Sequence, residues 1–496
     1  MTAEPVYLDH AATTPVDSRV AALVATLLSA PPGNPGSSHA PGRRAAAQVE
    51  AARAQVAALV GAAPDQVVFT SGATEADNLA ILGHMRGLPA ASRAGAEVIT
   101  LATEHKAVLT PVRKLEHEGF KARVLTPGPT GRLLPGQLEA AITPATALVS
   151  VLHVNNETGV VQDIAAIAAL CAARGIALHV DAAQSAAWLP VDLAGIDYLS
   201  LSGHKLGGPP GVGALVIAPH RRGRLEPLVV GGGQERGLRA GTLPVPLVAG
   251  FGLACELVRA DRDAAAARVA ALRDRLQAGL EALSGVLFNG DRDHRSPAIL
   301  NLSFEGVDGE ALVAALPGLA LSTGSACDSA TGEPSFVLRA LGRDTQLAQA
   351  SLRFSLGRGT SAADIDFAVD TVRGAVARLR ELSPAQPAPV ADWQAAGAEV
   401  RVGEAGAVRL GTWVRLLLCV REGRIEDARF QAYGCPHVLV ACEGLVAALR
   451  GLPLDAPQPG SPEDWRRAVD APVEKLGRIL IIEDALRNTI PPWPST

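Results

Sequence analysis

Short apolar runs alternate with longer alanine-rich stretches over the first half of the chain. Continuous runs of this kind are typical of strands that helices cover on both faces of a sheet. They occupy 67–70, 98–101, 148–152, 178–180 and 199–201. The pattern predicts an α/β domain with a mostly parallel sheet, extending to about residue 260.

A helical pattern is clearest just after this region. Apolar side chains recur at spacings of three and four residues at Val269, Leu272, Leu276, Leu280 and Leu283. This spacing places them on one face of an amphipathic helix. We expect a smaller α+β segment from 261 to about 380.

The sequence pattern then changes at about residue 383. Residues 383–389 include three prolines and show no hydrophobic periodicity, which predicts an extended linker at 381–395. Beyond it, residues 396–496 are expected to form a separate small domain. There, 414–420 and 425–432 predict a β-hairpin, and 436–449 predicts a helix with proline in its first turn.

The bulk composition narrows the class of protein. The net charge is −5 with no basic stripe, which argues against nucleic-acid binding. The opening residues lack the basic and apolar regions of a signal peptide, and no apolar run reaches the roughly 18 residues of a membrane helix, so we expect a cytoplasmic protein with no membrane association. The six cysteines have irregular spacings and predict no disulfide framework.

Lys205 and Asp181 are the most informative pair of residues. Lys205 follows Ser202-Gly203-His204 after one predicted strand, and Asp181 ends an earlier one. Pyridoxal phosphate needs an amine for its aldehyde and a carboxylate for its ring nitrogen. Either residue alone is readily explained as a solvated loop lysine or a capping aspartate. Together they predict a pyridoxal phosphate site.

Three further turns follow predicted strands. At 69–75 a strand leads through a glycine turn into a helix, so that backbone N–H groups and the Thr74 hydroxyl can bind a phosphate. His105 is placed to lie on a cofactor ring, although alone it would be interpreted as a solvated loop residue. Asn155 and Asn156 offer amides to the substrate or the ring oxygen. In an α/β fold such turns gather at the carboxyl ends of the strands.

Motifs spread over the first 380 or so residues carry a resemblance to a known family. They are Tyr7-Leu8-Asp9-His10-Ala11-Ala12-Thr13-Thr14-Pro15, Gly33-Asn34-Pro35, Ser71-Gly72-Ala73-Thr74-Glu75, Val154-Asn155-Asn156-Glu157, Gly231-Gly232-Gly233-Gln234-Glu235, Arg239-Ala240-Gly241-Thr242 and Arg353-Phe354-Ser355-Leu356-Gly357-Arg358. This region resembles a cysteine desulfurase of the NifS/IscS type, a fold-type I pyridoxal phosphate enzyme related to class V aminotransferases. The resemblance implies a large domain at about 16–260 and a small domain made from 1–15 and 261–380.

The resemblance also implies the roles of individual residues. Lys205 binds the cofactor aldehyde, Asp181 faces the pyridine nitrogen and His105 stacks on the ring. The remaining cofactor-binding residues implied are Ala73, Thr74, Asn156, Gln184, Ser202, His204 and, from a second subunit, Thr242, which makes a homodimer the expected state. Asn156 and Arg353 are implied to bind the substrate, with Arg353 gripping its carboxylate through two parallel N–H bonds.

Cys327 is implied to be the nucleophile, in a run of small residues that suits a thiol which must travel. The implied activity converts L-cysteine to L-alanine and leaves the sulfur as a persulfide on Cys327, with Lys205 and His105 moving protons. The sulfur acceptor, a scaffold or another protein, serves iron–sulfur cluster assembly or other thiolation. Two alternatives stay open, namely selenocysteine lyase activity and a non-catalytic assembly protein.

The segment 396–496 resembles the N-terminal scaffold domain of the IscU/NifU family, through Gly423-Arg424-Ile425-Glu426-Asp427-Ala428, Tyr433-Gly434-Cys435 and 479–486. Most cluster ligands of that family are missing, because this chain has Leu410, Thr412 and Gly477 or Arg478 at their positions. Only Cys435 matches, so we expect no bound metal. Cys419 and Cys442 are expected to pack in the core. Cys435 could be a sulfur relay or a relic, and the domain a docking or dimerisation module.

Overall fold

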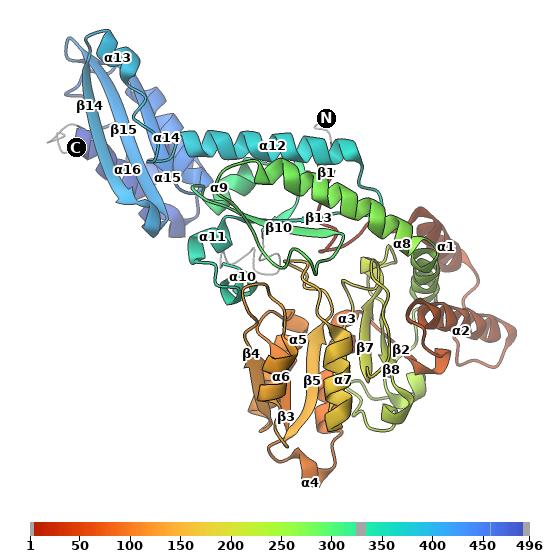
Figure 1. Cartoon of the computed structure of the whole chain (residues 1–496). Helices are drawn as coiled ribbons and strands as arrows, with labels where there is room; N and C mark the ends of the chain where they lie inside the picture. The colour runs from red at the N-terminus through yellow and green to blue at the C-terminus, as the bar shows by residue number, and fades with distance from the viewer. Residues whose placement is uncertain (1–3, 324–333, 457, 490–496) are drawn as a thin grey trace.

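A computed structural model of the protein describes residues 4–323, 334–456 and 458–489. Its largest sheet has seven strands in the order β2-β8-β7-β6-β5-β3-β4 (Figure 1). Strand β8 runs antiparallel to both of its neighbours and the other pairs are parallel, so the prediction of a mostly parallel sheet is confirmed. The strands are β2 Val67–Thr70, β3 Glu97–Leu101, β4 Lys121–Leu125, β5 Thr146–Leu152, β6 Ala177–Asp181, β7 Tyr198–Ser202 and β8 Gly213–Ile217.

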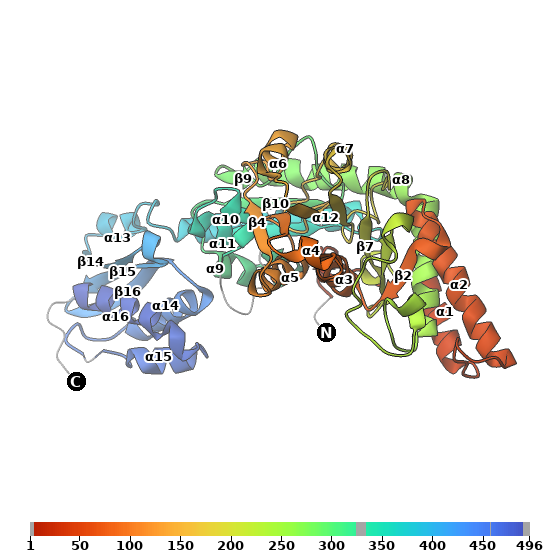
Figure 2. The same ribbon diagram turned by 90° about the horizontal axis from the view of Figure 1, so that it is seen from below.

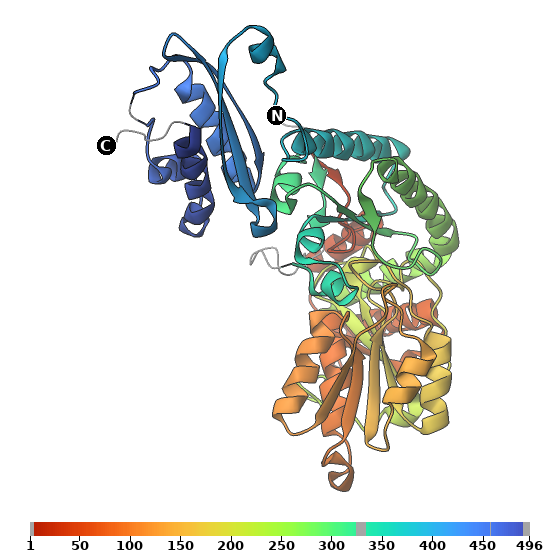
Figure 3. The ribbon, with the colours of Figure 1, turned by 60° about the vertical axis from the view of Figure 1, so that its left-hand side comes forward.

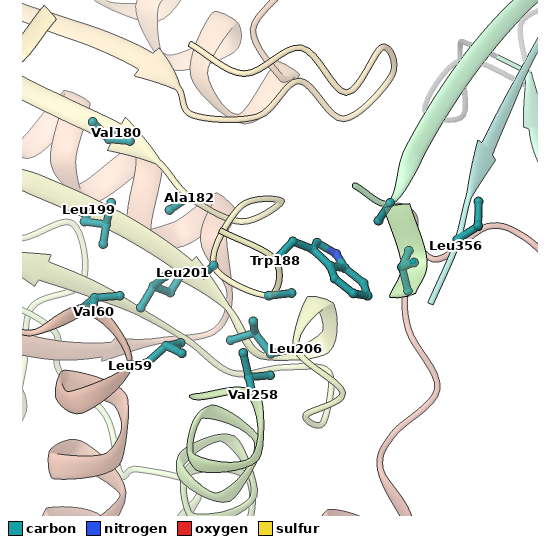
Figure 4. Packing of buried hydrophobic residues seen from close by; sticks show 14 of the residues in the cluster. Leu59, Val60, Val180, Ala182, Trp188, Leu199, Leu201, Leu206, Val258 and Leu356 are labelled. Carbon is teal, nitrogen blue, oxygen red and sulfur yellow. The ribbon is translucent and has the colours of Figure 1, made fainter. Parts of the chain in front are cut away.

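Helices cover both faces of this sheet, which is why its inner strands are mostly apolar and almost entirely buried. One face packs on α3 and α5 in a cluster with Leu148, Tyr198 and Leu215. The other face packs on α2, α7 and α8 in the main core, part of which is drawn in Figure 4. The helices are α1 Ser18–Ser29, α2 Ala40–Val60, α3 Ala73–Arg86, α4 Ala90–Arg93, α5 Lys106–His117, α6 Pro135–Ala141, α7 Ile164–Arg174 and α8 Val245–Glu281.

Helix α8 joins the large domain to the small one without a break, so the boundary predicted near residue 260 falls inside a helix. No proline interrupts its sequence after Pro246. Val269, Leu276 and Leu280 of the predicted apolar stripe are fully buried, which confirms the amphipathic pattern. Leu283 lies just beyond the helix end.

The small domain is built on a four-stranded antiparallel sheet in the order β12-β13-β10-β9. The N-terminal strand β1 pairs in parallel with β11, so the start of the chain is part of the small domain. The elements are β1 Val6–Tyr7, β9 Val286–Phe288, β10 Ile299–Phe304, α9 Gly309–Ala314, β11 Leu319–Ala320, β12 Ser322–Thr323, α10 Phe336–Ala340, α11 Thr345–Gln349, β13 Ser351–Ser355 and α12 Ala362–Glu381.

The C-terminal domain lies at one end of the molecule, beyond α12 (Figures 1 and 2). It has a three-stranded antiparallel sheet in the order β14-β15-β16, which confirms the predicted hairpin, and α14 coincides with the predicted helix. One sheet face packs on α14, α15 and α16. The elements are α13 Ala391–Ala395, β14 Glu399–Ala407, β15 Thr412–Arg421, β16 Arg424–Tyr433, α14 Pro436–Leu449, α15 Pro462–Ala468 and α16 Leu476–Thr489.

The segment predicted as a linker is only partly extended. Helix α13 lies within it and buries Trp393 against Leu417 and Cys419 on the second face of the small sheet. The Gln431 side chain also donates to the carbonyl oxygens of Gln386 and Pro387, at 3.3 and 3.2 Å. The packed structure of the C-terminal domain therefore begins before residue 396, because one buried tryptophan anchors an otherwise proline-rich run.

Side chains of the C-terminal domain also contact the small domain, which Figure 3 shows beside it. Lys475 donates to both carboxylate oxygens of Glu310, at 2.6 and 2.8 Å. The Tyr433 hydroxyl donates to the Val307 carbonyl at 3.3 Å, and Gln346 donates to the Val408 carbonyl at 2.6 Å. These polar contacts connect the two domains.

Candidate functional site

A cavity of about 470 Å³ opens at the carboxyl ends of the central strands, between the large domain and β13 of the small domain. All predicted site residues except Thr242 and Cys327 line it: Ala73, Thr74, His105, Asn156, Asp181, Gln184, Ser202, His204, Lys205 and Arg353. Cys327 lies outside the described residues. The parallel strands bring side chains distant in sequence together at one edge of the sheet.

Lys205 lies in the short 3₁₀ helix η2, Gly203–Lys205, which directly follows β7. Its Nζ donates to the carbonyl oxygen of Ala11 and, at 2.8 Å, to that of Ala12. Gln184 donates to the same Ala11 carbonyl at 2.8 Å. The N-terminal segment thus orients the amine that faces the cavity.

Asp181 and His105 are two titratable side chains of the cavity with shifted pKa values. Asp181 ends β6, and its Oδ1 accepts the Ala183 N–H at 2.8 Å. Burial, and next the neighbouring Asp77, raise the pKa of Asp181 to about 6. His105 caps α5 by accepting the Ala107 N–H at 3.1 Å, and burial lowers its pKa. A carboxyl group and an imidazole with shifted pKa values in one cavity are typical of an active site.

The N-terminus of α3 supplies the anion-binding part of the cavity. Ala73 and Thr74 are its first two residues, and Glu75 accepts the Ser71 N–H at 2.8 Å, which fixes the preceding turn. Unpaired N–H groups at a helix N-terminus favour a phosphate. His204 lies on the other side, bonded to the Thr13 hydroxyl at 3.1 Å, and burial lowers its pKa to about 4.

Arg353 reaches the cavity from β13. Its side chain is 2% exposed; one terminal nitrogen donates to Asp9 Oδ1 at 2.7 Å and the other to the Asn156 carbonyl at 3.0 Å. Its Nε is buried and has no partner among the described residues. An arginine held in this way is oriented for a carboxylate before the substrate arrives.

Thr242 lies apart from this cavity, exposed on the loop that precedes α8. The loop is fastened by Glu235, whose two carboxylate oxygens each accept a hydrogen bond from Arg53 at 2.8 Å. Both side chains of this pair are almost fully buried. The chain therefore does not bring Thr242 into its own site, and a role for it requires a second copy.

Taken together, the residues of the cavity fit pyridoxal phosphate. The helix α3 N-terminus suits its phosphate, Lys205 its aldehyde and Asp181 its ring nitrogen. Arg353 Nε, in the lining of the same cavity, is buried without a hydrogen-bond partner among the described residues, which a bound polar ligand would correct.

Sequence reasoning missed three polar residues buried beneath the cavity. Asp77, Glu104 and His179 are each 0% exposed. His179 bonds to the Ser150 and Ser200 hydroxyls at 2.8 and 3.0 Å, and its Nε2 lies 3.4 Å from Asp77 Oδ1. A signal was present, because His179 interrupts the apolar run at 178–180 and Asp77 follows Thr74 by one helical turn.

Among its described residues, the C-terminal domain holds no comparable site. Cys435 caps α14, is fully buried and has its Sγ 3.9 Å from Nδ1 of His437. Arg478 lies beside Cys435. Burial lowers the pKa of Arg478, but its interactions, with Cys435 first among them, raise this pKa overall. The lone thiol therefore has a cation as its neighbour. Within the described ranges no three His, Cys, Asp or Glu side chains are grouped to bind a metal. An iron–sulfur cluster does not fit these residues.

The other cysteines of this domain are core residues, as predicted. Cys419 lies in β15 and Cys442 in α14, and both are buried. Burial raises the pKa of both thiols. In the part of the chain that the structure describes, no helix is long and apolar enough to cross a membrane.

Two protein-family models match the chain. Residues 6–367 match the aminotransferase class-V family, and residues 385–495 match the NifU-like N-terminal domain. Among curated proteins, the cysteine desulfurases IscS of Klebsiella pneumoniae subsp. pneumoniae and Salmonella typhi are each 50% identical over 385 residues, covering 77% of this chain and 95% of theirs.

Solved structures agree with this likeness. A NifS-like protein superposes with a TM-score of 0.70 at 32% identity, covering 75% of this chain and 100% of that one. DndA from Streptomyces lividans is 46% identical with a TM-score of 0.61, covering 70% of this chain and 99% of that one.

Proposed function

Because the chain belongs to the aminotransferase class-V family, among the cysteine desulfurases of the IscS type, we propose that the cavity around Lys205 is its active site. The enzyme is a cysteine desulfurase. The observation that supports this site most strongly is the meeting of Lys205, Asp181 and His105, each from a different strand end, in one cavity. A NifU-like domain on the same chain indicates a role in iron–sulfur assembly.

The class-V family is known for pyridoxal phosphate enzymes, and the residues above would hold this cofactor. When bound, it supplies an aldehyde for the amino group of L-cysteine and a ring that takes up electrons from the substrate. Asp181 would keep the ring nitrogen protonated. Ala73, Thr74, Ser202 and His204 would hold the phosphate.

The protein's own groups carry out the remaining steps. Arg353 and Asn156 bind the substrate carboxylate, which places its Cα near Nζ of Lys205. Lys205 removes the Cα proton. The Cys327 thiolate then attacks the substrate sulfur, so that an S–S bond forms as the substrate Cβ–S bond breaks. His105, neutral at pH 7 because its pKa is lowered by burial, can carry the proton needed to release L-alanine.

Two finer points belong to the same proposal. Thr242 serves the site of a second copy, which makes the enzyme a homodimer, and the exposed position of its loop supports this. The C-terminal domain is a docking module without a cluster. Its contacts through Lys475, Tyr433 and the Val408 carbonyl support a fixed place beside the small domain.

The decisive experiment compares wild type with Cys327→Ser, a substitution that keeps the size of the side chain. Wild type should release L-alanine and transfer sulfur to a dithiol, and mass spectrometry should find one added sulfur atom on Cys327. Cys327→Ser should still bind L-cysteine, seen as a change in the visible spectrum, but release no sulfide. Wild-type sulfide release by Cys327→Ser would refute the mechanism. Cys171→Ser, at a buried core thiol, is the matched control and should stay active.

A further inference from the structure

Three carboxyl groups lie beneath the candidate site. Asp181 and Asp77 both line the cavity, and Glu104 is fully buried beside them. Glu104 Oε1 accepts the Leu152 N–H at 3.0 Å, whereas its Oε2 has no partner among the described residues. In that same part of the chain, neither Asp77 nor Glu104 lies within ion-pair distance of an arginine or lysine. Like charges this close to one another cannot all be present in a buried site.

The side chains around Asp77 determine whether its carboxyl group is charged. Strand β6 contributes His179 and Asp181, strand β7 contributes Ser200, and the turn before α5 contributes Glu104 and His105. Strands β2, β5 and β8 carry no titratable side chain, and the charged side chains of α5 are exposed. Lys205 and His204 line the same cavity from beyond β7. Asp77 therefore faces mainly neutral or acidic groups.

The protonation of the three carboxyl groups follows from burial. Burial raises the pKa of Asp181 to about 6 and that of Asp77 to about 7, and it raises the pKa of Glu104 well above its usual range. Asp181 loses its proton first, because the Ala183 N–H donates to its Oδ1 and favours its charged form. Glu104 stays neutral, and Asp77 changes its charge near neutral pH.

We propose that Asp77 is a positioning residue that acts through Asp181, and that its charge sets how firmly the ring nitrogen of the bound cofactor holds its proton. The inference rests on the proposed function, in which Asp181 faces that nitrogen. Helix α3 then serves the cofactor twice. Its N-terminus faces the phosphate, and one turn later Asp77 adds negative potential behind Asp181.

The test measures the ring nitrogen directly. Wild type, Asp77→Asn, Glu104→Gln and Asp181→Asn are loaded with ¹⁵N-labelled pyridoxal phosphate, and the ¹⁵N chemical shift is followed from pH 6 to 10. Loss of the Asp77 charge should lower the pH at which the ring nitrogen loses its proton by about one unit, the usual effect of one nearby buried charge. Glu104→Gln replaces a neutral group by a neutral group and should leave the titration unchanged.

Each outcome separates the two proposals. An Asp77→Asn titration identical to that of wild type overturns the role of Asp77. If Asp181→Asn also leaves the titration unchanged, the assignment of Asp181 itself is wrong. If Asp77→Asn does not fold, Ser200→Ala removes a hydroxyl that favours the charged form of Asp77, and its titration must then change in the same direction for the proposal to stand.

A second readout needs no cofactor. Since the pKa of Asp77 is about 7 in the folded protein and about 3.9 in an unfolded chain, its contribution to stability is complete below about pH 4 and is lost as the pH rises to about 7. The urea midpoint of the apoprotein should therefore fall over this range relative to that of Asp77→Asn. Parallel pH profiles for the two proteins would contradict the inferred titration of Asp77.

Discussion

The desulfurase domains and the C-terminal domain both pack apolar cores, but among the described residues only the former gather most of their predicted chemical groups in one cavity. Around Lys205 the polar side chains come from separate strand ends and meet in one cavity. In the C-terminal domain the ligand positions that the resemblance implies hold Leu410, Thr412 and Gly477 or Arg478 beside the one matching Cys435, and the domain still packs its sheet on three helices. The difference teaches that fold and chemistry depend on different residues, so the chemical groups can be lost while the fold remains.

The largest expected effect comes from removing the central amine. Lys205→Ala should lower alanine formation from L-cysteine by at least about 10³-fold, because general base catalysis alone is typically worth 10²–10⁴-fold. The circular dichroism spectrum should not change, since the Lys205 amine donates to backbone carbonyls of the N-terminal segment and the residue ends the short helix η2, outside every α-helix and strand. Substantial residual turnover would show that another group removes the Cα proton. Lys475→Ala, in the C-terminal domain, is the control and should stay active.

The next largest expected effect is on stability, where breaking a buried ion pair of the desulfurase domains is compared with breaking a more exposed pair of the C-terminal domain. Glu235→Gln leaves Arg53 charged and buried, so it should lower the free energy of unfolding by about 3 kcal/mol, measured by urea denaturation. In the C-terminal domain, Glu404→Gln breaks the pair with Arg415, in which Glu404 is 46% exposed, and should cost less than about 1 kcal/mol. Equal losses would mean that burial does not decide the strength of these pairs.

Deleting the C-terminal domain should have a small effect on catalysis. A chain ending at residue 384 should keep its turnover within about twofold, because sites without shared partners act independently. It loses the contacts to Val307, Glu310 and Gln346. Sulfide and alanine release, measured with a small dithiol as acceptor, tests this. A loss of more than tenfold would show that the C-terminal domain contributes to the active site.

The smallest expected effect concerns iron binding, for which we expect no bound iron. After incubation of the full chain with iron and sulfide and removal of excess reagents, no iron should remain bound, because Cys435 alone cannot hold a cluster. Iron content is measured per chain, and Cys435→Ser is the matched control with the same expected result. One cluster per chain in wild type, lost in Cys435→Ser, would restore the scaffold role that the residues around Cys435 argue against.

The sequence predicted the elements of the fold well wherever the pattern was strong. The strand at 67–70 and the helix at 436–449 match the structure at both ends, because apolar runs and a proline at a helix start are local signals. The antiparallel strand β8 was not predicted, since its direction depends on pairing with β2 and β7. Trp393 was missed because a single buried side chain leaves no periodicity.

The candidate site shows the same limit. Residues in family motifs, such as Lys205 and Asp181, were identified from the sequence and line one cavity. The pairing of Asp77 with His179 was not visible, because these residues are about a hundred positions apart and meet only through the packing of α3 on β6. Thr242 was predicted as a site residue but is absent from the cavity of its own chain, and its proposed role in a second copy stays a prediction.

The contacts of the N-terminal segment determine how late in synthesis the candidate site can form. Ala11 and Ala12 hold the Lys205 amine, but the strand before them pairs with Leu319–Ala320, and Asp9 forms a bridge with Ser355. During synthesis from the N-terminus, these partners emerge from the ribosome long after the lysine does. The amine therefore reaches its final position only when most of the polypeptide has been translated. Until then, an incomplete nascent chain has an unformed reaction centre.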